Sequence, residues 1–161
     1  MHIWTIRKWE KNYYVSNLEH RTGVRLKFDK EVDPEVKRAC KEFLAWIRTE
    51  YYFPIRVPIY VKASEKIRAK DGDMVYGTFF GPDDKNVEPY VRISAGDYVE
   101  RLKKRGKDRA LTGILLSIAH ELTHYFQWIN DIQLTPIGEE RQATMYARYI
   151  VDEYAETREH P

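Results

Sequence analysis

The sequence has 161 residues, 43% of them hydrophobic, which suffices for one domain with a core of its own. We therefore expect a single domain over residues 1–161. Lysine and arginine together number 27 and aspartate and glutamate 25, so the formal net charge of +2 excludes a strong overall attraction to nucleic acid or to an anionic membrane.

Branched and aromatic residues that alternate with polar ones predict strands in the first part of the chain. The predicted strands cover residues 3–9, 13–16 and 24–28. Asp33 and Pro34 then mark the start of a helix, with Asp33 as the N-cap and Pro34 in the first helical position. Apolar residues recur at helical spacing up to Tyr51, which predicts a helix that packs behind the sheet.

Further short strands are predicted in the middle of the chain, at residues 55–57, 59–61, 74–80 and 90–93. Because proline cannot donate a ladder hydrogen bond, the prolines near the first two should push at least one strand to an edge of the sheet. An edge strand can hold an extended peptide through main-chain hydrogen bonds, and residues 77–80 or 91–94 can provide it.

A basic cluster precedes the second half of the chain. Its members are Arg101, Lys103, Lys104, Arg105, Lys107 and Arg109. We interpret it as the solvated end of a short helix followed by a turn at Gly106, and the alternative interpretation is a patch that binds the phosphates of a nucleic acid.

The most informative motif is His120-Glu121-Leu122-Thr123-His124. Each residue of a helix advances by about 100°, so the two imidazoles and the carboxylate lie on one flank, and apolar residues between 111 and 129 gather on the other. Gly113 and Ser117 lie on the flank of the histidines and suggest a cleft floor, although Gly113 can also let another helix approach. Two histidines at this spacing with a glutamate between them are typical of a hydrolytic zinc site.

Zinc needs a third protein ligand, and the chain offers few candidates after the motif. Thr135 to Gly138 is interpreted as a turn, followed by a helix from Glu139 to about Thr157. Small residues follow Glu140 at three, four and seven positions, so this helix can lie close to the first one. We expect Glu140 to be the third ligand, with Glu139 as the alternative.

Residues 110–150, with the motif and then Glu140 to Ala147, resemble the gluzincin metallopeptidases, and the short chain is similar to minigluzincins. The resemblance implies an α+β, zincin-like fold: short, mostly antiparallel strands with a backing helix, an active-site helix and a C-terminal glutamate helix. One position departs from the family pattern. Thermolysin-type members carry an aspartate four residues after the ligand glutamate, to orient the first histidine, and this chain has Thr144 there.

These residues predict a zinc metallopeptidase that binds one zinc ion per chain through His120, His124 and Glu140 and acts on a peptide or protein substrate. Glu121 is expected to take a proton from the attacking water and to deliver it to the leaving amine. Two alternatives remain open at this point. One is a regulatory or DNA-associated protease-like protein that uses the basic cluster, and the other is a non-catalytic metal-binding domain.

Cys40 is the single cysteine, which excludes an internal disulfide and a zinc ribbon of several cysteines. The first seven residues contain no apolar segment of the length of a signal peptide, and no stretch approaches the roughly eighteen apolar residues of a membrane span. We therefore predict a cytoplasmic location and no membrane partner.

Overall fold

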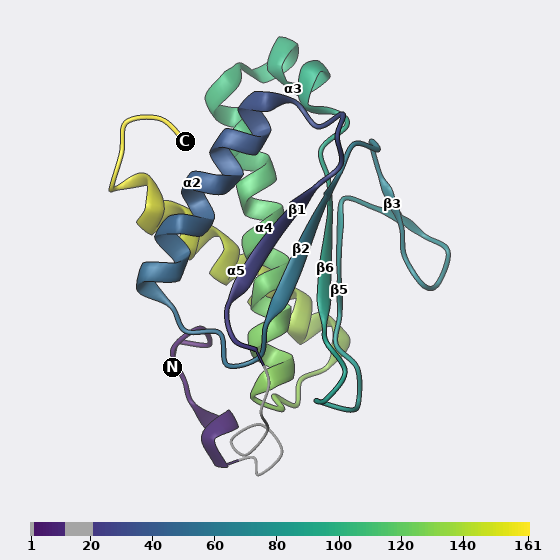
Figure 1. Cartoon of the computed structure of the whole chain (residues 1–161), viewed down its shortest axis with the longest axis vertical. Helices are drawn as coiled ribbons and strands as arrows, with labels where there is room; N and C mark the ends of the chain where they lie inside the picture. Colours follow the sequence, from purple (N-terminus) through teal and green to yellow (C-terminus); the bar gives the residue numbers. More distant parts are fainter. Residues whose placement is uncertain (1, 12–20) are drawn as a thin grey trace.

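A mixed four-stranded sheet organises the chain, as seen in a computed structural model that describes residues 2–11 and 21–161 (Figure 1). Its strands lie in the order β1-β2-β6-β5, with bounds Val24–Phe28, Val57–Lys62, Tyr90–Ser94 and Gly77–Phe80. β1, β2 and β6 run parallel, and β5 is antiparallel to β6. With the helices described below, this makes an α+β fold.

The prediction of mostly antiparallel strands is wrong for this sheet, because two of its three pairings are parallel. The chain between β1 and β2 forms helix α2 (Pro34–Glu50), and a helical crossover returns the next strand in the same direction. The antiparallel pairings are β5 with β6 and the two-residue strands β3 (Ile67–Arg68) with β4 (Met74–Val75).

Pro58 does not push its strand to an edge, since β2 lies between β1 and β6. The N–H of Val57 points to β1, where it donates to the carbonyl of Gly23, so the nitrogen of Pro58 faces β6. Pairing with β6 begins only at Ile59. The missing donor therefore costs the sheet no hydrogen bond.

The predicted strand over residues 3–9 is also wrong, because this segment forms turns and a short 3-10 helix, Lys8–Lys11. Its apolar side chains insert into the core instead of lining a sheet: Ile3 and Trp4 are buried, and the indole N–H of Trp4 donates to Thr123 Oγ1 at 2.9 Å. The strand predicted over residues 13–16 lies outside the described residues.

Four helices complete the described part of the fold. α2 is followed by α3 (Tyr98–Arg105), α4 (Lys107–Ile129) and α5 (Pro136–Ala155). α2 contacts β1 and α4, and α4 contacts β5, β6 and α5, so the helices cover one face of the sheet. Every second residue of β2 and β6 faces these helices and is fully buried, which forms the core of the protein.

Two of the described helices, α2 and α5, begin with a side-chain cap. Asp33 caps α2 as predicted, accepting a hydrogen bond from the N–H of Glu35 at 2.8 Å. The interpretation of residues 135–138 as a turn is wrong, because Thr135 accepts from the N–H of Gly138 at 3.1 Å and Pro136 opens α5.

The basic cluster spans the junction of α3 and α4, where Gly106 has a φ of +86°. Three of its members form ion pairs with acidic neighbours: Arg101 with Asp97, Lys104 with Glu100 and Lys107 with Glu35. The predicted short helix and turn are thus confirmed. No helix in residues 2–11 and 21–161 has the length and apolar content needed to cross a membrane.

Candidate metal centre

α4 carries the motif with one flank in the core and the other at a cleft. Leu122, Tyr125 and Phe126 are buried against the sheet and the N-terminal segment, while His120 and His124 are half-buried and face α5. Burial of these apolar side chains fixes how α4 is rotated about its own axis. This rotation directs both imidazoles toward the same place on the neighbouring helix.

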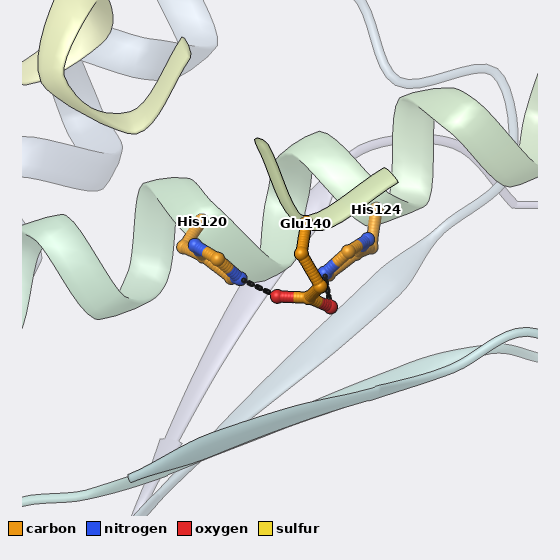
Figure 2. A group of neighbouring side chains, drawn as sticks. All are labelled: His120, His124 and Glu140. Carbon is orange, nitrogen blue, oxygen red and sulfur yellow. Dashed lines mark hydrogen bonds and ion pairs between the residues drawn. The ribbon is translucent and has the colours of Figure 1, made fainter. Parts of the chain in front are cut away.

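His120, His124 and Glu140 form the group of potential ligands that the structure brings together (Figure 2). Nε2 of His120 lies 3.1 Å from one carboxylate oxygen of Glu140, and Nε2 of His124 lies 3.0 Å from the other. One atom from each residue lies within 4.8 Å of the others. Glu139, the alternative predicted from the sequence, is not part of this group.

Close packing of α5 on α4 places Glu140. Ala143 and Ala147 lie on the same face of α5 as Glu140 and are buried. Their small side chains let the two helices approach, as the spacing predicted. The carboxylate itself remains 63% exposed, so it reaches the histidines from the solvent side.

Gln127, which was not predicted from the sequence, sets the tautomer of His124. Its amide nitrogen donates to the carbonyl of Glu139 at 3.0 Å, which orients the amide, and its oxygen lies 2.7 Å from His124 Nδ1. An amide oxygen only accepts, so Nδ1 carries a proton. The signal in the sequence was the spacing, because a residue three positions after His124 lies on the same helix face.

With the proton on Nδ1, the neutral form of His124 presents a lone pair at Nε2, 3.0 Å from a carboxylate oxygen of Glu140. Two acceptors at this distance repel each other unless a proton or a cation lies between them. Burial is the main cause that lowers the pKa of His120, followed by the nearby His124, and Glu140 opposes both. A lowered pKa favours the neutral imidazole of His120, which is the form that binds metals.

The donor set fits zinc. Two imidazole nitrogens and a carboxylate oxygen are ligands that zinc takes in catalytic sites. Ligand atoms about 2.1 Å from a tetrahedral ion lie about 3.4 Å from one another. The nitrogen-to-oxygen distances of 3.0 and 3.1 Å are close to this value.

Glu121 is buried beside these ligands, where only 7% of its surface is exposed. Burial raises the pKa of Glu121 to about 8, and the charge of Glu140 adds to the effect. The side chain of Glu121 packs against Gly77 of strand β5. An added Cβ at this position would lie 3.1 Å from Glu121 Oε1 and 3.2 Å from its Cγ. Glycine at this position thus leaves room for the carboxylate.

A cleft of about 1070 Å³ contains His120, Glu121, His124 and Glu140. Its walls are β5 with the segment before it and the exposed side of α5. β5 is an edge strand of the sheet, whereas β6 is paired on both sides. Of the two edge strands predicted, the one over residues 77–80 is thus the one at the cleft.

One end of the cleft is closed by Trp128. Its indole N–H donates to the carbonyl of Pro82 at 2.8 Å, and its ring packs on Gly81, where an added Cβ would lie only 2.6 Å from Trp128 Cδ1. Lys85 lies over the ring and forms an ion pair with Asp131 at 3.3 Å. This end is therefore a preformed wall.

Gly113, Ser117 and Thr144 take different places relative to the cleft. Gly113 lies beneath the guanidinium of Arg101, so it serves the approach of α3 and lies outside the cleft, although Ser117 lines it. Thr144 lines the cleft, but no hydrogen bond joins it to His120 in the described part of the chain.

Comparisons with protein-family models, with curated proteins and with solved structures found no significant match to this chain. The chemistry of the site is therefore argued from its geometry.

Proposed function

We propose that this protein is a zinc-dependent metallopeptidase with a zincin-like fold. The observation that carries the proposal is the convergence of His120, His124 and Glu140 beside the buried carboxylate of Glu121. A metal ligand set alone needs no such carboxylate. Hydrolysis of a peptide bond requires an acid or base close to the metal ligands. An extended peptide also needs a surface to pair with, and the edge strand in the wall of the cleft offers one.

His120, His124 and Glu140 would hold the ion, and Gln127 would keep His124 in the tautomer that leaves Nε2 free to bind. A zinc ion in this position supplies Lewis acidity that polarises a carbonyl group and lowers the pKa of water. The edge of β5 holds the peptide by main-chain hydrogen bonds and orients its carbonyl toward the site.

Glu121 carries the proton transfers. A cation held by the three ligands would favour the ionised form of Glu121. Its carboxylate then takes a proton from the water whose oxygen bonds to the carbonyl carbon, and the carboxyl gives that proton to the amine nitrogen as the carbon–nitrogen bond breaks. The nearly complete burial of Glu121 excludes competing solvent from this carboxylate. The products are a carboxylic acid and an amine, between which the second proton of the water passes to leave a carboxylate and an ammonium group.

The cytoplasmic location predicted from the sequence stays a proposal. Cys40 is buried in α2 as a free thiol, and burial raises its pKa to about 12, which makes it unreactive.

The test combines metal analysis with a peptide-library cleavage assay on the wild type and on Glu121→Gln. We expect about one zinc ion per chain in both proteins and cleavage by the wild type alone, because the amide cannot accept the proton. Zinc bound without cleavage in either protein would favour the non-catalytic metal-binding domain. Cleavage by Glu121→Gln would remove the assigned base.

A further inference from the structure

The cleft has two lysine or arginine side chains in its described walls, Lys85 and Arg148. Lys85 is neutralised, since it forms an ion pair with Asp131 at 3.3 Å and donates to the carbonyl of Trp128 at 3.0 Å. Arg148 is exposed, and no ion pair or hydrogen bond joins it to the described residues. A guanidinium in a cleft without an internal partner is available to an anion from solution.

The course of α5 leads Arg148 away from the Lys85 end of the cleft. α5 begins beside Gln127, which donates to the carbonyl of Glu139 at 3.0 Å, and its next residue, Glu140, reaches the histidines. Later turns of the helix therefore lead away from the Trp128 end. Arg148 follows Glu140 by two turns, which is about 12 Å along the helix axis.

The direction of a bound peptide follows from the charges at the two ends. β5 starts at Gly77, which contacts Glu121, and leads to Gly81, which contacts Trp128. Asp83 lies just beyond, at the Trp128 end of the cleft, and is exposed. A peptide whose amino end lies near Asp83 and whose carboxyl end lies near Arg148 runs antiparallel to β5, which permits regular pairing with this edge.

We propose that Arg148 binds a carboxylate of the substrate on the C-terminal side of the cleaved bond. This specificity rests on the proposed peptidase function. The backbone positions of Glu140 and Arg148 are offset by about 12 Å along α5, a length that three or four residues of extended peptide span, so we place the carboxylate within about four residues of that bond. It can be the C-terminal carboxylate of a short peptide or the side chain of an acidic residue, and both fit the planar fork of the guanidinium.

The test measures binding to the zinc-loaded Glu121→Gln protein, so that peptides stay intact. Four pools of random octapeptides, otherwise free of charged side chains and blocked at the N-terminus, are compared by fluorescence anisotropy. Two pools end in a free carboxylate and two end in an amide. Within each pair, one pool contains a single glutamate and the other contains none. The same pools are then measured with Arg148→Met added, and with Arg141→Met as the control on the same helix, outside the cleft.

We expect pools that carry a carboxylate to bind about five-fold more tightly than the neutral pool, as for a charge-assisted contact at a partly exposed site. Arg148→Met should abolish this preference without changing zinc content or unfolding temperature, and Arg141→Met should keep it. If tight binding is lost when the C-terminus is amidated, Arg148 binds the C-terminal carboxylate. If an amidated pool with glutamate still binds tightly, Arg148 binds the side chain of an acidic residue.

Equal affinity for all four pools would overturn the assignment of Arg148, and so would a carboxylate preference that survives Arg148→Met. Both results leave the proposed function standing, provided that the wild type cleaves peptides. A failure of every pool to bind would overturn the assignment together with the proposed function.

Discussion

Replacing Gln127 by leucine tests how the site holds His124. Gln127 is 4% exposed and makes three hydrogen bonds: its oxygen accepts from His124 Nδ1 at 2.7 Å, and its nitrogen donates to the carbonyl of Glu139 and to Gln142 Oε1 at 3.0 and 2.9 Å. Leucine has a similar volume but none of these groups. The imidazole of His124 is then free to rotate or to change its tautomer.

The loss of such an orienting partner weakens metal binding by roughly 10- to 100-fold, or about 1.4 to 2.7 kcal/mol. Each buried hydrogen bond contributes about 1 kcal/mol net, so the metal-free protein should also lose about 1 to 3 kcal/mol of unfolding free energy. Zinc affinity is measured by competition with a chromophoric chelator, at a temperature where urea titration shows every variant folded.

Gln142→Leu is the matched control, because it removes one partner of the Gln127 nitrogen and leaves the contact with His124 in place. Its zinc affinity should stay within about three-fold of the wild type. Gln127→Glu should keep part of the affinity, since a carboxylate also accepts from Nδ1 but cannot donate to the carbonyl of Glu139. If Gln127→Leu bound zinc as tightly as Gln142→Leu, the argument from the tautomer of His124 would be wrong.

Three further predictions concern other parts of the chain. Gly77→Ala should lower peptide turnover about ten-fold or more without reducing zinc content, because the new methyl group would lie 3.1 Å from Glu121 Oε1 and displace it. Tyr125→Phe should cost about 2 kcal/mol in urea unfolding, since the buried hydroxyl bonds both the N–H and the carbonyl of Ile55. Asp29 has its pKa lowered by a backbone N–H bond and by a neighbouring lysine, so it stabilises the fold at neutral pH and loses this effect as pH falls through the lowered pKa. Between about pH 6 and pH 2 the unfolding free energy of the wild type should therefore fall more than that of Asp29→Asn, and parallel curves would contradict the assignment.

The histidine pair and Glu140 could be predicted because both depend on local helical spacing. The motif sets the flank of α4, and the small residues of α5 allow the approach that brings Glu140 to the histidines. Gln127 was missed, although its position on that flank was equally visible. Its role depends on the carbonyl of Glu139, which only the packed pair of helices brings within reach.

The direction of the strands could not be predicted from their residue patterns, because alternation reveals which side chains are buried and not which way a strand runs. The helical crossover between residues 28 and 57 was the available signal for parallel pairing. Helix starts were predictable in principle. The rule that located the start of α2 at Asp33 and Pro34 also fits Thr135 and Pro136, where a turn was predicted instead.

The central claim is that His120, His124 and Glu140 bind one zinc ion together. An anomalous difference map from crystals of the zinc-loaded protein, collected at the zinc absorption edge, tests it most directly. We expect one peak per chain, about 2.0 to 2.2 Å from Nε2 of each histidine and from a carboxylate oxygen of Glu140. A peak elsewhere in the chain, or one at the histidines with Glu140 turned away, would contradict the account.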